Sequence, residues 1–161
     1  MQSGRLAAGV YPGAHTVEKA RQQVFHLLDV GVNTFIDLTH PSDRLHRYEA
    51  LLGERPEIKA EHFEFPIVDV SIPDTALMEA ILDCVDDALT RGRVAYIHCI
   101  GGVGRTGTVV GCHMVRHGLS GREALAKIAE LRSSMPVPDR WKRSPETGAQ
   151  EEMVMNWMAG R

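Results

Sequence analysis

The sequence predicts an α/β fold in which a mostly parallel sheet is covered by helices on both faces. Short apolar runs alternate with longer amphipathic stretches over the first hundred residues, which is the order of strand–helix–strand units. Several of these runs are continuously apolar, as expected for strands buried on both faces. After residue 104 the pattern is helical, so the last third of the chain adds helices and no further strand.

Four segments have the length and composition of strands, at residues 6–10, 34–38, 63–68 and 93–98. The first ends at Tyr11-Pro12-Gly13 and the second before Pro41, because proline cannot continue a strand ladder. The last of these strands is predicted to be central and to deliver Cys99 at its carboxyl end.

Six helices are predicted, over residues 17–30, 44–52, 76–90, 104–117 and 121–131, with the last opening at 144–146. Thr16 is a suitable N-cap for the first helix. Ser120 and Glu123 have the spacing of a capping box. In Ser144-Pro145-Glu146, proline stands at a favoured first helical position.

Composition narrows the class of protein. The 161 residues are predicted to form one domain, 1–161, with ordinary fractions of hydrophobic (43%) and charged (24%) residues. A net charge of −3 gives no reason to expect nucleic acid or a membrane as partner. The first residues lack the apolar core of a signal peptide, and the odd count of three cysteines favours reduced thiols. We therefore expect a cytoplasmic protein.

The most informative stretch runs from His98 to Thr108. It places Cys99 directly after an apolar run, and a glycine-rich turn and then Arg105 follow. The backbone N–H groups of such a turn can surround a tetrahedral dianion, and arginine can donate two hydrogen bonds to it. A thiol at the bottom of this electropositive turn ionises readily. The predicted phosphate-binding residues are Cys99, Ile100, Gly101, Gly102, Val103, Gly104 and Arg105.

Two other phosphate motifs are tested against the same stretch. Residues 102–107 fit G-x-G-x-x-G, but a dinucleotide site needs a following strand, and helices follow here. A Walker loop needs lysine directly after its last glycine, where Thr108 stands. Neither motif is supported.

The pattern His-Cys-x5-Arg-Thr-Gly resembles the signature loop of the cysteine-dependent protein tyrosine phosphatase superfamily. The chain is similar in particular to its compact dual-specificity members, such as those of the cyclin-dependent-kinase-associated type, over nearly its whole length. The resemblance implies that Cys99 is the nucleophile and that His98 supports the loop. It also implies that the hydroxyl of Thr106 stabilises the departing thiolate, with helix capping as the alternative role.

The resemblance also implies an acid and a water-positioning residue. Asp69 aligns with the acid loop of the family and is the predicted proton donor. Asp74 is the alternative acid, although helix N-capping explains it equally well. Gln150 resembles the glutamine that positions the attacking water, but Glu146 stands where the family often has a second glutamine. An ordinary surface role for Gln150 is the alternative.

The predicted function is that of a metal-independent phosphomonoesterase without a cofactor. Phosphotyrosine in proteins is the expected substrate, with phosphoserine and phosphothreonine as further ones. The alternatives are a phosphoinositide or small phosphoester phosphatase, a phosphate-recognition module without turnover, and arsenate reduction or sulfur transfer. Residues 140–143 (Arg-Trp-Lys-Arg) are basic and can attract an anionic substrate. The eight histidines are scattered and suggest no metal site.

Overall fold

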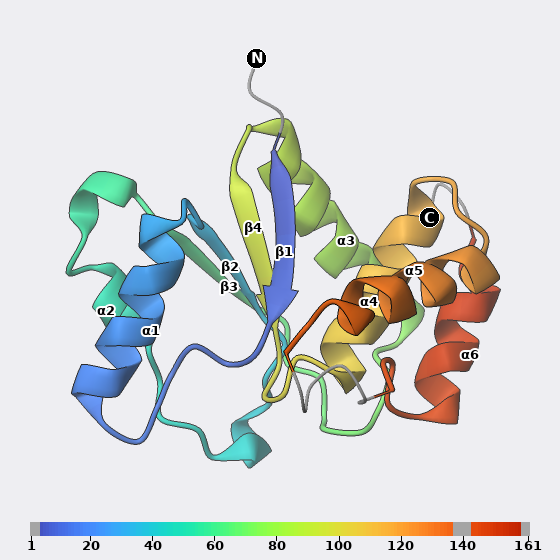
Figure 1. Cartoon of the computed structure of the whole chain (residues 1–161), viewed down its shortest axis with the longest axis horizontal. Coiled ribbons are helices and arrows are strands. Elements are labelled where there is room, and N and C mark those ends of the chain that lie inside the picture. Colours follow the sequence, from blue (N-terminus) through green and yellow to red (C-terminus); the bar gives the residue numbers. More distant parts are fainter. Residues whose placement is uncertain (1–3, 137–142, 159–161) are drawn as a thin grey trace.

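A computed structural model describes residues 4–136 and 143–158. Its sheet has four parallel strands: β1 (Arg5–Gly9), β2 (Thr34–Asp37), β3 (Glu61–Glu64) and β4 (Val94–His98). The strand order is β1-β4-β2-β3, so β4 is central (Figure 1). The last residues of β1 and β2, Gly9 and Asp37, both pair with His98. The loops that follow these three strands therefore meet at one edge of the sheet, beside Cys99.

The described part of the chain has six α-helices around the sheet: α1 (Val17–Asp29), α2 (Glu49–Leu52), α3 (Thr75–Thr90), α4 (Gly104–Arg116), α5 (Gly121–Ser133) and α6 (Gly148–Asn156). Two short 3-10 helices, η1 (Pro41–Asp43) and η2 (Pro56–Ile58), stand on either side of α2 in the sequence. Figure 1 shows α1 and α2 on one side of the sheet and α3 to α6 on the other. The predicted fold class is confirmed.

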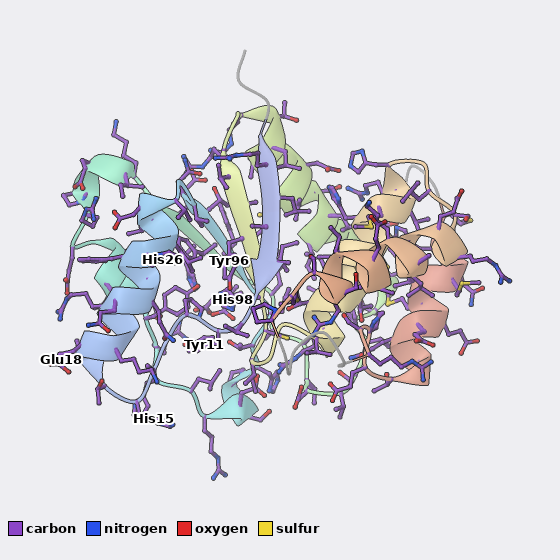
Figure 2. All side chains as sticks on the ribbon, viewed as in Figure 1. Tyr11, His15, Glu18, His26, Tyr96 and His98 are labelled. Atoms are coloured by element: carbon purple, nitrogen blue, oxygen red, sulfur yellow. The ribbon has the colours of Figure 1, made fainter. Side chains whose placement is uncertain are left out.

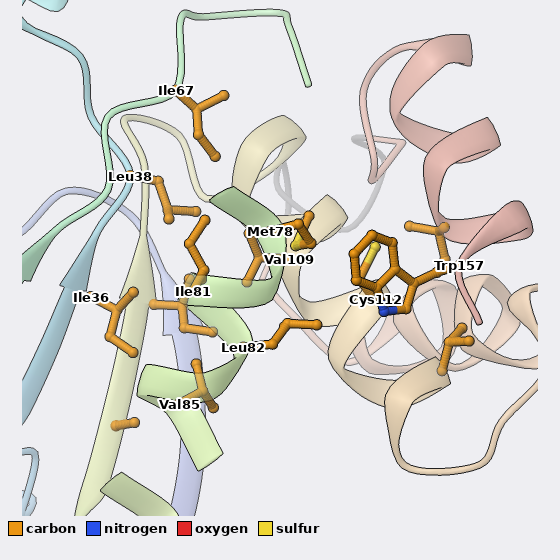
Figure 3. Packing of buried hydrophobic residues seen from close by; sticks show 14 of the residues in the cluster. Ile36, Leu38, Ile67, Met78, Ile81, Leu82, Val85, Val109, Cys112 and Trp157 are labelled. Carbon is orange, nitrogen blue, oxygen red and sulfur yellow. The ribbon is translucent and has the colours of Figure 1, made fainter. Parts of the chain in front are cut away.

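Each face of the sheet has its own hydrophobic core. Side chains of α1 and α2, such as Val24 and Leu52, pack on Phe35 and Tyr96. On the other face α3 and α4 pack on β2 and β4, and Trp157 adds its ring beside Cys112 (Figure 3). Alternate residues of β2 and β4 enter opposite cores, which explains why both strands are apolar throughout.

Three helix N-termini follow the sequence prediction. The Thr16 side chain accepts a hydrogen bond from the backbone N–H of Lys19, and Asp74 accepts one from that of Leu77. Ser120 and Glu123 form the predicted capping box. These signals were correct because a cap depends only on residues within one turn of it.

The predicted helix over residues 44–52 is wrong in its first half. Only α2, Glu49–Leu52, is helical, and η1 precedes it. Arg44 ends η1 in the left-handed region with φ 53°, which interrupts helical geometry. The carbonyl of His46 accepts a hydrogen bond from the Tyr11 hydroxyl, so this segment is fixed by a distant residue.

Two further boundaries are corrected. The strand predicted at residues 63–68 is β3, Glu61–Glu64, and it ends before Pro66, which has no backbone N–H to donate. The last helix does not begin at residues 144–146. It begins at Gly148 behind the N-cap Thr147, and Pro145 precedes it in a cis peptide.

No helix among residues 4–136 and 143–158 is long and apolar enough to cross a bilayer. The expectation of one domain over residues 1–161 stays a prediction.

Candidate active site

The loop between β4 and α4 is held from outside through its carbonyl groups. The carbonyl of Ile100 accepts from the Tyr11 N–H at 2.9 Å, and that of Val103 accepts from Ser144 Oγ at 2.7 Å. The carbonyl of Gly102 accepts from the Arg132 guanidinium at 3.3 Å. Because these carbonyls bind surrounding groups, they keep the loop in one conformation.

The amide groups of the same loop remain available. Within the described residues, no backbone N–H from Ile100 to Thr106 donates a hydrogen bond to another group. Val103 caps α4 without a side-chain acceptor, so the first turn of the helix also lacks partners. Gly102 has φ +63°, and a Cβ there would meet the Gly9 carbonyl, which explains the glycine. The loop thus offers a group of unused donors at the positive end of a helix dipole.

Arg105 is almost fully buried beside this loop, and its guanidinium donates hydrogen bonds through Nη1 only. Its Nη1 donates to Asp43 Oδ2 at 2.7 Å and to the Ile67 carbonyl at 2.9 Å. Its Nε and Nη2 are buried without a hydrogen bond among the described residues. The unused edge of the guanidinium is the one that can bind two oxygens of an anion.

Asp43 is a site residue that sequence reasoning missed. Its carboxylate is 4% exposed and accepts hydrogen bonds from Arg105 and from the His40 N–H. It fixes Arg105 by occupying Nη1. No local pattern marks Asp43, but it lies in the loop after β2, next to the loop after β4 in a parallel sheet.

The two candidate acids have different positions. Asp69 is half-exposed, and its Oδ1 lies 3.0 Å from Arg105 Nη2. Asp74 caps α3 through Oδ1, which accepts from the Leu77 N–H at 2.8 Å. Asp69 therefore faces the loop of Cys99, whereas the capping interpretation accounts for Asp74.

Thr106 and Gln150 are both buried near the start of α4. Thr106 Oγ1 has no hydrogen-bond partner among the described residues, and Thr106 lies inside α4, so it does not cap the helix. The Gln150 side chain accepts from the N–H groups of Glu146 and Thr147 and donates to the Ser71 carbonyl. The surface alternative for Gln150 is wrong, because its side chain is fully buried. It lies against Gly104, where a Cβ would touch its amide.

His98 links the candidate active site to the face of the sheet that α1 and α2 cover. Its Nε2 lies 2.7 Å from the hydroxyl of the fully buried Tyr48. Burial raises the pKa of Tyr48, so this hydroxyl keeps its proton and donates a hydrogen bond to Nε2. The ring of Tyr11 packs edge-on against the rings of Tyr48 and His98. Tyr11 and His98 are labelled in Figure 2. Tyr48 thus fixes His98, the residue directly before Cys99, which agrees with a supporting role for His98.

A buried neutral His98 gives the protein a specific pH dependence. Burial lowers the pKa of His98 to about 4, although the nearby Asp37 carboxylate partly opposes this. In the unfolded chain histidine binds a proton below about pH 6.5, so the unfolded state gains protons first. We expect the free energy of unfolding to fall between pH 6.5 and pH 4, by at most about 3 kcal/mol.

Denaturant unfolding of wild type and His98→Gln at several pH values would measure this. The wild type should lose more stability than the variant across that window. Asp37 acts at lower pH. Burial opposes its ionisation, but the nearby His62 and His98 rings and hydrogen bonds from Thr39 hold its pKa below the usual value. Its stabilising effect is therefore lost only as the pH falls below about 4. Parallel pH curves for the two proteins would contradict a buried neutral His98.

Of the other two cysteines, Cys112 lies in the core and Cys84 is partly buried against it. Burial raises the pKa of Cys84 to about 11 and that of Cys112 to about 12. Both thiols therefore stay protonated at neutral pH, as their place in apolar helix patterns predicts. All three cysteines are free.

Part of the predicted basic segment 140–143 lies outside the described residues. Arg143 is described, and it forms an ion pair with Glu151 of α6.

An apolar cavity of about 770 Å³ lies between β1 and helices α4 and α5, and it touches Gly101 and Gly102. Cys99, Arg105 and Asp69 do not line it, so this cavity is not the place where those three side chains meet.

A parallel sheet that ends in a buried cysteine, a donor-rich loop and an arginine at a helix N-terminus is typical of protein tyrosine and dual-specificity phosphatases. Residues 10–154 match the model of one family in this class, PTP-SAK, described as "Swiss Army Knife protein, DSP-PTPase phosphatase domain". The chain belongs to this family, and the resemblance to compact dual-specificity phosphatases is confirmed.

Relatives by sequence include uncharacterised and named proteins. An uncharacterised protein of Methanocaldococcus jannaschii, MJECL20, is 35% identical over 97 residues, which is 60% of this chain and 58% of that protein. The tyrosine-protein phosphatase CDC14 of Saccharomyces cerevisiae is 26% identical over 82 residues, which is 50% of this chain and 15% of that protein. Arabidopsis thaliana PTEN1, a phosphatidylinositol 3,4,5-trisphosphate 3-phosphatase and protein-tyrosine-phosphatase, is 30% identical over 64% of this chain and 26% of that protein. The matched segments cover less than two thirds of these relatives.

Solved structures share the fold at low sequence identity. Kinase-associated phosphatase has a TM-score of 0.73 at 21% identity, covering 92% of this chain and 83% of that one. Tk-PTP in its active form has a TM-score of 0.71 at 23% identity, covering 96% and 91%. PTPMT1 in complex with PI(5)P has a TM-score of 0.66 at 19% identity, covering 94% and 89%. These likenesses support the fold alone.

Proposed function

We propose that this chain hydrolyses phosphate monoesters through a cysteinyl-phosphate on Cys99, without a metal ion or cofactor. One observation carries the proposal. Within the described residues, the buried Arg105 keeps Nε and Nη2 without a hydrogen bond, with only the half-exposed Asp69 paired to Nη2, and seven backbone amide groups beside it have no partner, at the helix N-terminus that follows Cys99. Leaving buried donors without partners costs free energy, and a bound phosphate dianion would satisfy them. Membership of a phosphatase domain family supports the same reaction.

In the first step the thiolate of Cys99 attacks phosphorus, so an S–P bond forms while the ester P–O bond breaks. Charge on the equatorial oxygens is stabilised by the loop amides and by the free edge of Arg105. Asp69, protonated at this stage, donates its proton to the leaving oxygen. The ion pair between Asp69 and Arg105 supports this role, because it keeps the carboxyl group beside the loop that begins at Cys99.

In the second step water attacks phosphorus and the S–P bond breaks, which returns the thiolate and releases inorganic phosphate. The Asp69 carboxylate takes the proton from that water, and Thr106 Oγ1 donates to the departing thiolate. Gln150 positions the water. Its side chain lies at the start of α4 and joins the Ser71 carbonyl of the acid loop to the segment before α6.

We propose phosphotyrosine in proteins as the substrate, with phosphoserine and phosphothreonine as further substrates. Phosphoinositides are a second candidate class, because PTEN1 and the PI(5)P complex of PTPMT1 are among the similar proteins. The loop itself carries Ile100, Val103 and glycines, with no lysine for additional phosphates. Three free cysteines support the predicted cytoplasmic location.

The test is release of inorganic phosphate from p-nitrophenyl phosphate, phosphopeptides and phosphoinositides, each with and without EDTA. Hydrolysis that survives EDTA and favours phosphotyrosine peptides is expected. Loss of hydrolysis with EDTA would contradict the metal-independent mechanism, and a preference for phosphoinositides would move the substrate to the second class.

Replacing Asp69 should affect substrates according to their leaving group. We expect Asp69→Asn to lower kcat/KM for phenyl phosphate about 100-fold, the usual range for a general acid. For p-nitrophenyl phosphate the loss should be less than about tenfold, because that leaving group needs less protonation. Steady-state kinetics with both esters would measure the difference.

Asp74→Asn is the matched control, because asparagine caps a helix as well as aspartate does. It should leave both rates nearly unchanged. If Asp69→Asn has equal, small effects on both esters and Asp74→Asn reproduces the leaving-group dependence, Asp74 is the acid.

A further inference from the structure

Two histidines and a carboxylate meet between α3 and α4, away from the candidate active site. His113 lies in the last turn of α4, and His117 follows the helix as its C-cap, so the two are four residues apart on one face. Asp86 reaches them from α3. At a rise of 1.5 Å per residue, His113 lies about 14 Å along α4 from Gly104, where the helix begins.

The three side chains point their donor atoms at one place. Asp86 Oδ1 lies 3.1 Å from His113 Nε2 and 2.8 Å from His117 Nε2. One ligand atom from each residue lies within 4.8 Å of the others, and the two imidazole centroids are 4.5 Å apart. Metal–ligand bonds of about 2.0–2.2 Å place the ligand atoms of a tetrahedral site about 3.3–3.5 Å apart. Small side-chain movements would therefore produce that geometry.

The surroundings hold the carboxylate in this position. Arg116 Nη1 lies 3.1 Å from Asp86 Oδ2 and 2.8 Å from Asp83 Oδ1. Asp86 thus presents Oδ1 to the histidines while its Oδ2 is held by Arg116. Carboxylates that bind metals are commonly held in this way by an outer hydrogen-bond partner. The negative charge of Asp83 offsets the positive charge of Arg116, so Arg116 does not repel a cation from the cluster.

The histidines differ in burial. His113 is mostly enclosed between α3 and α4. His117 is 55% exposed, which leaves an open side for water and for entry of an ion.

We propose that Asp86, His113 and His117 form a binding site for a divalent transition-metal ion of the Zn²⁺ type. The ion would take Nε2 from each imidazole and Oδ1 from the carboxylate, with water in the fourth position. Each neutral imidazole would move its proton from Nε2 to Nδ1. The ion would join α3 to α4 and stabilise the folded protein, and it takes no part in the proposed hydrolysis.

Co²⁺ and Zn²⁺ titrations of the full chain test this proposal. The Cys99→Ser protein is the parent, since a thiolate at Cys99 would also bind these ions. After treatment with EDTA and desalting, we expect Co²⁺ to give visible absorption that saturates at one equivalent and is displaced by Zn²⁺. Zn²⁺ should also raise the midpoint temperature of unfolding.

His117→Ala is the decisive variant, because its exposed position tolerates alanine. It should weaken Co²⁺ binding by more than about tenfold, because loss of an outer partner of a ligand alone costs that much, and it should remove the Zn²⁺ stabilisation. His26→Ala is the control, since His26 is an exposed histidine on α1 (Figure 2) and should change nothing. Absence of saturable binding in the parent, or equal affinity in His117→Ala, would show that the cluster is only an ion-paired contact.

Discussion

Cys99→Ser is expected to abolish phosphate release, with a loss of more than about 10⁴-fold in kcat, the scale seen when a covalent nucleophile is removed. A serine hydroxyl in the same position is not ionised at neutral pH, so it cannot form the phosphoenzyme at a useful rate. Hydrolysis of p-nitrophenyl phosphate by equal amounts of folded wild type and variant would measure the loss. Binding of inorganic phosphate or vanadate should remain, because Arg105 and the loop amides are unchanged.

Cys84→Ser on α3 provides the matched control and should keep full activity. Iodoacetamide adds a second readout: at neutral pH it should alkylate Cys99 alone and inactivate the enzyme, and vanadate should protect against it. Burial raises the pKa values of Cys84 and Cys112 to about 11 and 12, so both should react slowly. Hydrolysis that persists in Cys99→Ser would end the covalent mechanism.

Arg105→Lys should lower kcat/KM by about 10³-fold, near the upper range for loss of a hydrogen-bond donor to transition-state charge. Lysine keeps the charge but cannot present the Nε–Nη2 edge to two oxygens while Nη1 stays on Asp43. Kinetics with p-nitrophenyl phosphate, together with binding of vanadate, would measure the effect. Vanadate should also bind more weakly, because the same edge contacts its oxygens.

Two further variants serve as comparisons for the loss of activity in Arg105→Lys. Arg122→Lys, an exposed position on α5, should change nothing. Asp43→Asn should lower activity less than Arg105→Lys, because Asp43 acts only by holding the guanidinium. Near-normal rates in Arg105→Lys would mean that a positive charge alone suffices. The planar Nε–Nη2 pair of donors would then make no contribution to catalysis.

The alternative of a recognition module remains open to the same experiments. A protein that binds phosphopeptides but releases no phosphate, with or without intact Cys99, would fit that class. The buried cysteine and the half-exposed Asp69 facing Arg105 favour turnover, because simple phosphate binding needs neither a nucleophile nor an acid. Arsenate reduction or sulfur transfer would require thiol partners for Cys99, and the other two cysteines lie in the core or beside it.

Much of the site could be predicted because its parts are consecutive in the chain. The sequence from His98 to Thr108 determines a strand end, a glycine-dependent turn and a helix start, and each depends on near neighbours. The caps at Thr16, Asp74 and Ser120 were predictable for the same reason. Boundaries failed where a distant residue decides the local conformation, as with Tyr11 and the segment before α2.

By itself, the sequence determined the fold class and the loop that presents Cys99 and Arg105. It also identified Asp69 and Asp74 as the two candidate acids. Only the tertiary structure decided which groups fix those residues: Asp43 on Arg105, Tyr48 on His98, and Gln150 on the Ser71 carbonyl. It also brought His113 and His117 to Asp86. The physical reason is that a hydrogen bond or a metal ligand set depends on separation in space, which the packing of helices and strands determines and no spacing along the chain records.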